Sequence, residues 1–230
     1  MRPLTYVIPK CLLPIGGRPL LERTMKYLEG HGVTEFILCV AYLKKQIIDA
    51  FGDGSALGYK IEYAQSETPL GTAGQLKTAS GLLDETFLVM NGDIVTNLNI
   101  GNLVAVHRKK GGIATIALKE FGVKIPYGHI VLDGGGKVTA FEEKPTLSYM
   151  ANAGVYVMEP RVLDVIPSGR VSSLETEVFP LLITKGESIN SYFESAYWAD
   201  VGSMADFERV NDEALSDPSI VAPPGPERSD

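Results

Sequence analysis

The first half of the chain alternates between two spacings of apolar residues. Recurrence at every third or fourth position predicts helices over residues 19–29, 43–51, 72–83 and 100–110. Short continuous apolar runs, typical of strands covered on both faces, predict strands over residues 36–40, 59–64 and 87–90. Because strand and helix follow one another, the pattern indicates an α/β fold with a mostly parallel sheet and helices on both faces.

The pattern changes after Gly112, where strand-like runs are separated by glycine-rich turns. Strands are predicted over residues 113–119, 129–133, 138–142, 154–158 and 189–193, with a short segment over residues 196–199. Helices are predicted over residues 161–165, 176–184 and 204–215. We expect one domain over residues 1–216, whose first half binds a nucleotide and whose second half forms a substrate site. Residues 217–230 are rich in proline, serine and charge, and we expect a disordered tail there.

The composition is that of an ordinary globular protein with a substantial core: 230 residues, 45% hydrophobic and 21% charged. The formal net charge of −7 argues against a general nucleic-acid-binding surface, although not against a local cationic pocket for phosphates. Cys11 and Cys39 lie in apolar stretches and are expected to be reduced thiols in the core. No apolar run is long enough to span a bilayer and no secretory leader is present, so we expect a cytoplasmic protein without a membrane partner.

Two segments of the first half stand where ligands bind in open α/β sheets. Residues 69–74 (Pro-Leu-Gly-Thr-Ala-Gly) lie at a strand-to-helix junction, where glycines let a ligand approach the backbone and the helix N-terminus favours an anion. A plain helix-initiating turn has the same composition. Asn91-Gly92-Asp93 directly follows an apolar strand, so Asp93 is placed either to hold a metal or to complete an ordinary turn. Both interpretations of each segment stay open.

Two later segments combine charge with a strand end. Residues 141–145 (Phe-Glu-Glu-Lys-Pro) offer a lysine for a phosphate and a carboxylate for sugar hydroxyls, or else form a solvated strand end. Residues 198–202 contain Asp200 and the only tryptophan, a residue that is more often a core anchor than a ligand platform. The three histidines are scattered, so neither a metal cluster nor a nucleophile–base pair is indicated.

Taken together and in this order, these segments resemble the motifs of the sugar-1-phosphate nucleotidyltransferases, or sugar-nucleotide pyrophosphorylases. The resemblance covers about residues 1–210. It is carried by Arg2-Pro3-Leu4-Thr5, Pro9-Lys10, Leu13-Pro14-Ile15, Arg18-Pro19, residues 69–74, Asn91-Gly92-Asp93, Tyr127-Gly128, Glu143-Lys144-Pro145, Asn152-Ala153-Gly154 and residues 198–202.

The resemblance implies a Rossmann-like mixed sheet flanked by helices. It also implies a reaction in which a sugar-phosphate oxygen attacks the α-phosphate of a nucleoside triphosphate, releasing pyrophosphate and leaving a nucleoside diphosphate sugar. Such chemistry depends on positioning and on charge stabilisation by Mg²⁺ and cationic groups. The substrate supplies the nucleophile, so the absence of a hydrolytic triad is expected.

The resemblance further implies roles for the charged residues of these motifs. Asp93 and Asp200 would hold Mg²⁺, an ion that prefers hard oxygen ligands. Lys10 would contact the nucleotide or the transferring phosphate, and Lys144 would contact the sugar 1-phosphate.

The remaining implied contacts are to the sugar and the base. Glu143, Asn152 and the backbone at Gly128 would hold sugar hydroxyls. The base would approach the backbone at Gly71, and Gln65 would face the edge of the base.

The chain departs from the family at its start. Family members begin with a strand and a glycine-rich loop ahead of the segment matched by residues 2–5, and an arginine of that loop helps pyrophosphate to leave. Met1 stands where the family usually has leucine, so we expect that an alternative start codon was chosen and that the printed chain omits the strand and the loop. The sheet would then lack a central strand, and the unpaired edges of its neighbours would favour aggregation or loss of activity.

A smaller departure concerns the base. Gln65 lies one residue further from Gly71 than in the uridylyl- and thymidylyl-transferring members. Residues 69–74, preceded by Glu67, are similar to the mannose-1-phosphate guanylyltransferases. A guanylyl or thymidylyl donor is therefore favoured.

Three functions are compared on these grounds. The transferase needs a nucleoside triphosphate and a sugar 1-phosphate as partners, does not need nucleic acid, and leaves a homo-oligomer open. The second is a catalytically impaired nucleotide-sugar-binding protein, which the missing loop would produce. The third, a dehydrogenase, would need a Gly-x-Gly-x-x-Gly turn opening a helix, and the sequence has none.

Overall fold

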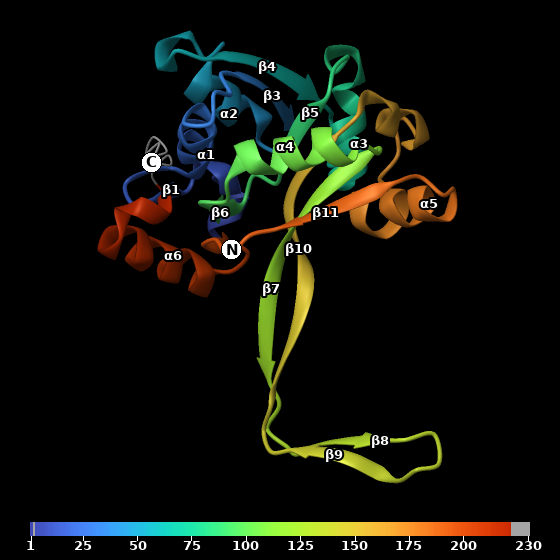
Figure 1. Cartoon of the computed structure of the whole chain (residues 1–230). Helices are drawn as coiled ribbons and strands as arrows, with labels where there is room; N and C mark the ends of the chain where they lie inside the picture. The colour runs from blue at the N-terminus through green and yellow to red at the C-terminus, as the bar shows by residue number, and fades with distance from the viewer. Residues whose placement is uncertain (2, 222–230) are drawn as a thin grey trace, which may run out of the picture.

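The computed structural model describes residue 1 and residues 3–221, and Figure 1 shows a body from which a long two-stranded arm projects. The helices are α1 (Leu20–Glu29), α2 (Lys44–Phe51), α3 (Gly71–Thr78), α4 (Ile100–Lys110), α5 (Phe179–Thr184) and α6 (Met204–Ser216). The strands are β1 (Pro14–Ile15), β2 (Arg18–Pro19), β3 (Glu35–Val40), β4 (Lys60–Gln65), β5 (Phe87–Met90), β6 (Ile94–Thr96), β7 (Ala114–Lys124), β8 (His129–Leu132), β9 (Val138–Glu142), β10 (Thr146–Met158), β11 (Ile189–Phe193) and β12 (Trp198–Asp200). Among the described helices, none is both long and apolar enough to cross a membrane.

The body is built on a four-stranded sheet with the order β11-β7-β10-β5. β11 runs parallel to β7, whereas β10 is antiparallel to both of its neighbours. β3 and β4 form a separate parallel pair, with Phe36 opposite Ile61 and Val40 opposite Gln65. The predicted α/β fold with a mixed sheet flanked by helices is confirmed. The expectation of a mostly parallel sheet is wrong for this four-stranded sheet, because β10 runs antiparallel to both neighbours and only β11 with β7 is parallel.

Successive side chains of β10 point into two different cores. Val155 and Val157 belong to a buried cluster that includes residues of α1, α2 and α4. Tyr156 and Met158 belong to a second cluster that includes residues of α3 and α5. Because neighbouring residues of a strand face opposite sides of the sheet, these helices cover its two faces. Burying each such side chain stabilises the fold by about 1.5–3 kcal/mol.

A third cluster joins α6 to the short pair of strands β6 and β12. Val210 and Ala214 stand four residues apart, on one face of α6, and both are buried against Val95 and Ala199 of the two strands. β6 has only three residues and was not predicted, since so short a segment has no readable spacing.

The sheet is interrupted between β3 and β5. In the described part of the chain β3 pairs only with β4, and β5 pairs only with β10, so each has one unpaired edge. The predicted interruption of the sheet is therefore seen. Cys39, expected in the core, is instead exposed on β3, because it faces away from the buried Phe36 and Val40; Cys11 is half-buried.

Residues 119–152 form a projecting segment, called the β-arm below. Beyond the body, β7 and β10 continue as a two-stranded antiparallel ribbon, from Lys119 opposite Ala151 to Lys124 opposite Thr146. The hairpin of β8 and β9 closes its far end (Figure 1). No residue of the β-arm is buried. The ribbon makes β7 and β10 longer than predicted. Its strands are paired by backbone hydrogen bonds but bury no side chain, so the sequence there has no alternation of apolar and polar residues from which to predict a strand.

Several other predicted bounds shift. α3 ends at Thr78 and is followed by a 3-10 turn, and residues 161–165 also form a 3-10 turn. The predicted tail begins with the 3-10 turn Pro218–Val221, in which Ile220 is buried against the third cluster. Residues 222–230 of that tail lie outside the described residues.

Candidate active site

Backbone pairing between two short strands brings Asp93 and Asp200 together. Ile94 of β6 lies opposite Asp200 of β12, and the amide of Val201 donates to the carbonyl of Asp93 at 2.9 Å. Asp93 also closes a turn in which the Ile94 amide donates to the Asn91 carbonyl at 3.3 Å. Residues 91–93 therefore form a turn and also place the Asp93 carboxylate beside Asp200. The turn interpretation and the metal-ligand interpretation of this segment are thus compatible.

The ammonium of Lys10 is bound by both carboxylates. Its Nζ lies 2.7 Å from Oδ2 of Asp93 and 3.7 Å from Oδ1 of Asp200. The Lys10 side chain is 28% exposed, against 34% and 48% for the two aspartates, so the cluster is open to solvent. Three residues expected to bind metal and phosphate thus form one group, called the Lys10 cluster below.

Like charges within the Lys10 cluster affect its protonation. Burial first, and then the negative charge of Asp93, raise the pKa of Asp200 above its ordinary value, whereas Lys10 lowers it. A divalent cation would relieve the same repulsion. In proteins Mg²⁺ is usually bound by one or two carboxylates together with substrate phosphates and water. The described residues contain no group of three or more His, Cys, Asp or Glu suited to a metal, so a cation here needs ligands from substrate or water. The donor set fits such an ion.

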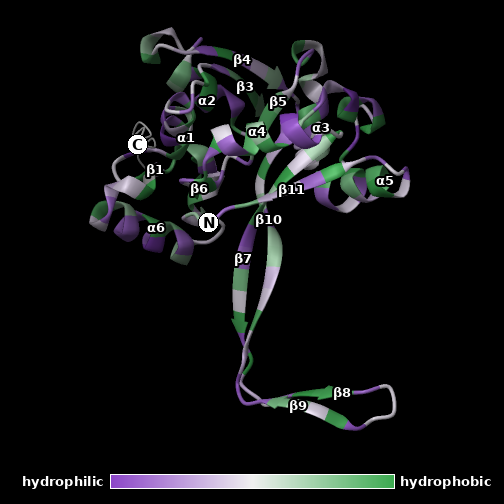
Figure 2. Ribbon diagram, viewed as in Figure 1, coloured by the Kyte–Doolittle hydropathy of each residue, from purple (hydrophilic) through white to green (hydrophobic). Residues whose placement is uncertain are grey.

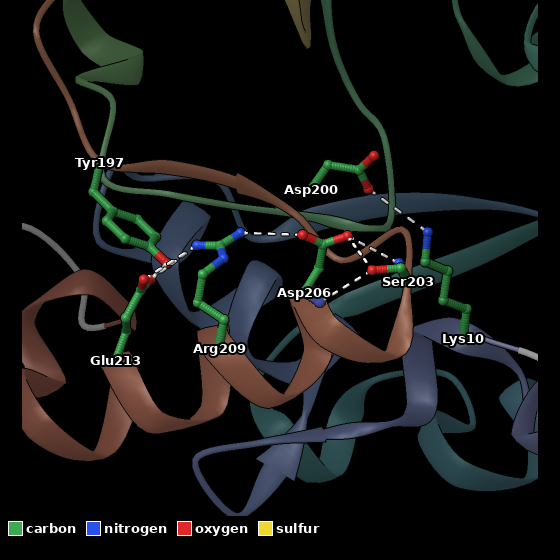
Figure 3. A network of polar contacts seen from close by, with 7 residues as sticks. All are labelled: Lys10, Tyr197, Asp200, Ser203, Asp206, Arg209 and Glu213. Atoms are coloured by element: carbon green, nitrogen blue, oxygen red, sulfur yellow. Dashed lines mark hydrogen bonds and ion pairs between the residues drawn. The ribbon is translucent and has the colours of Figure 1, made fainter. Parts of the chain in front are cut away.

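A polar network fixes the segment that carries Asp200 (Figure 3). Ser203 caps α6, because its hydroxyl accepts the Asp206 amide at 3.1 Å while the Asp206 carboxylate accepts the Ser203 amide at 3.0 Å. On the other side of Asp200, the hydroxyl of Tyr197 donates to Glu213 of α6. The chain before and after Asp200 is therefore anchored to the same helix.

Gly71 opens α3 in a conformation that only glycine adopts easily. Its φ is +74°, and a Cβ there would lie 2.4 Å from the carbonyl oxygen of Ser172. That oxygen accepts the amides of Ala73 at 3.1 Å and Gly74 at 3.3 Å. The fold itself therefore needs the glycine, whether or not a base approaches it. Gln65 is exposed at the carboxyl end of β4.

Glu175 is an exposed carboxylate that no sequence motif indicated. It accepts hydrogen bonds from the hydroxyls of Thr72 at 2.7 Å, Ser173 at 2.8 Å and Tyr156 at 3.2 Å. Burial would raise the pKa of Glu175, but these hydrogen bonds outweigh it and hold the pKa below its ordinary value. The ionised carboxylate ties the first turn of α3 to β10. Its partners are distant in sequence, so no local pattern indicates the role.

Asn152 belongs to the same network. Its Nδ2 donates to the hydroxyl of Tyr156 at 2.7 Å, and its Oδ1 accepts the Gly154 amide at 2.9 Å. Gly154 has φ +70°, and a Cβ there would lie 2.8 Å from Nδ2 of Asn91. The residue expected to hold sugar hydroxyls thus lies beside the turn that carries Asp93.

Three of the residues expected to hold the sugar hydroxyls or the sugar phosphate lie instead in the β-arm, where the ribbon bends into its hairpin. A Cβ on Gly128 would lie 3.1 Å from Oε2 of Glu143. The Nζ of Lys144 lies 3.9 Å from Oε1 of Glu143, and both side chains are 63% exposed. The extended chain from Lys144 to Asn152 covers about 26 Å at ~3.3 Å per residue. The structure does not bring Gly128, Glu143 and Lys144 to the Lys10 cluster.

Comparison with known sequences identifies the family. A profile described as "Nucleotidyl transferase" matches residues 1–217. The chain belongs to the nucleotidyl transferase family. The resemblance drawn from the ordered motifs is therefore confirmed at the level of the family.

Two curated relatives show what this nucleotidyl transferase is similar to. It is 39% identical to "Mannose-1-phosphate guanylyltransferase" of Mycobacterium tuberculosis (strain ATCC 25618 / H37Rv) over 216 residues. This alignment covers 91% of the chain and 59% of the relative. It is 35% identical over 228 residues to "UTP--glucose-1-phosphate uridylyltransferase" of Synechocystis sp. (strain ATCC 27184 / PCC 6803 / Kazusa), with coverage of 90% and 58%. The chain thus spans less than two thirds of the length of these relatives.

Solved structures support the same fold. The nucleotidyl transferase superposes on HddC from Yersinia pseudotuberculosis with a TM-score of 0.71 and 26% identity, covering 90% of each chain, and on the same protein complexed with GMP-PN. It superposes on a putative glucose-1-phosphate thymidylyltransferase from Bacillus anthracis with a TM-score of 0.72, covering 93% of this chain and 89% of the other. At 22% identity the latter likeness concerns the fold alone.

Proposed function

We propose that the chain carries the catalytic site of a cytoplasmic sugar-1-phosphate nucleotidyltransferase. It would transfer a nucleoside monophosphate from a nucleoside triphosphate to a sugar 1-phosphate and release pyrophosphate. The Lys10 cluster is the observation that carries the proposal, because it joins two carboxylates and an ammonium in a chain of the nucleotidyl transferase family. The names of both curated relatives support the reaction class.

The reaction needs charge stabilisation rather than a nucleophilic side chain. A sugar-phosphate oxygen forms a bond to the α-phosphorus, and the bond from that phosphorus to the bridging oxygen breaks, so its electron pair leaves with pyrophosphate. Asp93 and Asp200 would hold Mg²⁺, which neutralises charge on the phosphate oxygens when bound. Lys10 would donate hydrogen bonds to the phosphate that is transferred.

The specificity residues are proposed from their motifs and positions. Gln65 and Gly71 would face the base, and Asn152 would lie beside the sugar. Among the donors, GTP with mannose 1-phosphate is the first pair to test, since residues 69–74 follow Glu67 and the Mycobacterium relative carries that name. Lys144 would reach the sugar phosphate, and Glu143 the sugar hydroxyls, only when a β-arm lies against the Lys10 cluster.

Pyrophosphate release tests the proposal. Five nucleoside triphosphates would be combined with glucose, mannose and N-acetylglucosamine 1-phosphates in the presence of Mg²⁺. With the active pair, Asp93→Asn or Asp200→Asn should lower the rate by about 100-fold or more, because the charge that holds the metal is lost. The surface variant Asp212→Asn is the matched control and should keep the rate within about twofold. Wild-type rates in both site variants would contradict the assignment.

The interrupted sheet favours one second candidate, a nucleotide-sugar-binding protein without turnover. Within the part of the chain that the structure describes, β3 and β5 each have one unpaired edge, and both lie in the half of the fold expected to bind the nucleotide. This candidate predicts calorimetric binding of a nucleoside diphosphate sugar together with no pyrophosphate from any substrate pair. Release of pyrophosphate from one pair would exclude it.

A further inference from the structure

Asn91 is the only one of the seven asparagines whose side chain makes no hydrogen bond within the described residues. The side chains of the other six are each held by a partner: Asn97, Asn99, Asn102, Asn152, Asn190 and Asn211. Only the backbone of Asn91 is bonded, since its amide donates to the Gly154 carbonyl at 2.9 Å and its carbonyl accepts the Ile94 amide at 3.3 Å. Its Nδ2 packs against Gly154, where a Cβ would lie 2.8 Å away. The carboxamide of Asn91 is therefore positioned by packing alone.

The residue after Asn91 is glycine, and no other asparagine in the chain precedes one. Within the described residues the exposed Gly92 has an amide without a hydrogen-bond partner. A Cβ built on Gly92 would meet no atom within 4 Å, so the space beside this peptide is open. Because glycine has no side chain to obstruct it, this peptide can rotate easily toward the preceding carboxamide.

The strand before this turn is held along one edge. β5 is apolar throughout, as its colour in Figure 2 shows, and in the described part of the chain it pairs with β10 alone. The polar residues Asn91-Gly92-Asp93 follow it directly. Segments with few backbone hydrogen bonds open locally at a low cost in free energy. Local motion at the end of β5 can therefore bring the Gly92 nitrogen to the side chain of Asn91.

We propose that Asn91 is a site of spontaneous deamidation in the folded chain. The Gly92 nitrogen gives its proton to hydroxide and forms a bond to Cγ of Asn91, which closes a succinimide ring. The bond from Cγ to Nδ2 breaks, and the nitrogen takes a proton from water and leaves as ammonia. Water then adds to one of the two ring carbonyls: opening at Cγ gives aspartate, and opening at the main-chain carbonyl gives isoaspartate. Asparagine is among the residues that heat modifies most readily.

Either product changes the turn that carries Asp93. Aspartate adds a negative charge two residues from Asp93, at a site where two carboxylates share one ammonium. Isoaspartate also inserts one carbon into the main chain, and the carbonyl that accepts the Ile94 amide becomes a free carboxylate. The turn then no longer places Asp93 against Lys10. This consequence for turnover rests on the proposed transferase, whereas the deamidation itself does not.

Peptide mass spectrometry of aged protein tests the proposal. The folded full chain would be kept warm at mildly alkaline pH for days, beside a sample in guanidinium chloride that shows the reaction of the unfolded chain. Trypsin releases residues 78–108 as one peptide, in which three other asparagines are internal controls: Asn97, Asn99 and Asn102. A gain of about 1 Da should accumulate at Asn91 alone, and electron-transfer fragmentation should show isoaspartate there. No gain at Asn91 in the folded chain, or equal gains at the controls, would overturn the proposal.

Gly92→Ala tests the attacking nitrogen. Gly92 is not among the glycines with a positive φ, and the new Cβ meets no atom within 4 Å, so the fold should be kept. The methyl group obstructs the rotation toward Cγ, so modification at Asn91 should slow at least about tenfold. Gly134→Ala is the matched control, since its added Cβ also meets nothing and it lies in the hairpin of the β-arm. An unchanged rate in Gly92→Ala, or equal slowing in both variants, would overturn the proposed route.

Anion exchange separates the aged protein by its added negative charge, and each fraction would be assayed for pyrophosphate release. With the active substrate pair, the isoaspartate fraction should be at least about tenfold slower than the unmodified fraction, because Asp93 is displaced. Equal rates would show that the turn tolerates the extra carbon and would overturn the consequence for the site. If fresh protein releases no pyrophosphate from any pair, the transferase proposal fails, whereas the mass gain at Asn91 still decides the deamidation.

Discussion

At the scale of single residues, Lys10 sets the charge balance of the site. Its ammonium lies within 3.7 Å of two carboxylates that would otherwise repel each other. The three residues come from the N-terminal segment, from the turn after β5 and from β12. Strand-end positions made Asp93 a candidate from the sequence, but its approach to Asp200 depends on pairing between β6 and β12, which no local spacing encodes.

The pKa of Asp200 should respond in opposite directions to its two neighbours. Asp93→Asn removes a negative charge and should lower the pKa of Asp200, whereas Lys10→Met removes a positive charge and should raise it further. Carboxyl ¹³C chemical shifts followed against pH, without divalent cations, would measure both. The same pKa in all three proteins would contradict the geometry of the Lys10 cluster.

A second residue-scale prediction concerns buried His107, outside the site. Its Nε2 donates to Glu159 at 3.0 Å, since an ionised carboxylate only accepts, and Thr86 adds a bond at 2.9 Å. The bond from His107 is the main reason that the pKa of Glu159 lies below its ordinary value. The resulting stability is present above the ordinary glutamate pKa of about 4.3 and is lost as pH falls through the lowered folded value.

The free energy of unfolding of the wild type should therefore decline more steeply below about pH 4.3 than that of Glu159→Gln. Urea unfolding at several pH values between neutrality and pH ~3 would give both slopes. Parallel curves would show that Glu159 does not gain this stabilisation.

At the scale of elements, the sequence predicts best where a short run of residues between turn residues has a clear helical or strand pattern. The bounds of α4, β5, β9 and β11 agree with the prediction. The prediction fails where structure depends on distant partners: β6 forms because β12 pairs with it. The ribbon of β7 and β10 extends without any buried side to reveal it. Glu175 was missed for the same reason, since its partner Thr72 lies 103 residues away.

The start of α3 provides an element-scale test. Gly71→Ala must place a Cβ 2.4 Å from the Ser172 carbonyl at φ +74°. Gly58→Ala is the matched control, because its φ is +80° but nothing lies within 4 Å of the new atom. The control should lower the free energy of unfolding by about 1–2 kcal/mol, because alanine must adopt a left-handed backbone conformation. Gly71→Ala should cost at least about 1 kcal/mol more in urea unfolding, through the clash. Equal losses in the free energy of unfolding would show that the segment around Ser172 moves to accommodate the new Cβ at no further cost.

At the scale of the whole molecule, the two pieces of sheet are joined by side-chain packing rather than by backbone hydrogen bonds. Buried residues of β3, β4 and β10 share one cluster, yet in the described residues β3 and β5 are not paired. The family resemblance predicted this interruption, which the local patterns of the remaining strands do not show. Sequence motifs likewise predicted which residues to examine, but not that Lys144 would lie at the far end of a long ribbon whose root is beside the turn that carries Asp93.

Hydrogen exchange should report the interruption. Amides of β3 that point to its unpaired edge have no strand partner among the described residues, whereas β10 is paired on both sides over Tyr156–Met158. Peptides from β3 should therefore exchange faster than peptides from the inner part of β10, although both strands contribute to the same core. Mass spectrometry would measure the two rates. Equal protection would mean that the β3 edge is covered in solution.

The joint between Trp198 and the β-arm has a mechanical consequence. Trp198 lies on β12, the strand that also carries Asp200, and its hydrogen bond to Ala153 sets the angle at which the ribbon leaves the body. Over a lever of about 26 Å, a tilt of about 10° would sweep Lys144 through about 4–5 Å, further than a hydrogen bond reaches. A substitution at Trp198 would thus displace Lys144, although the two residues are far apart.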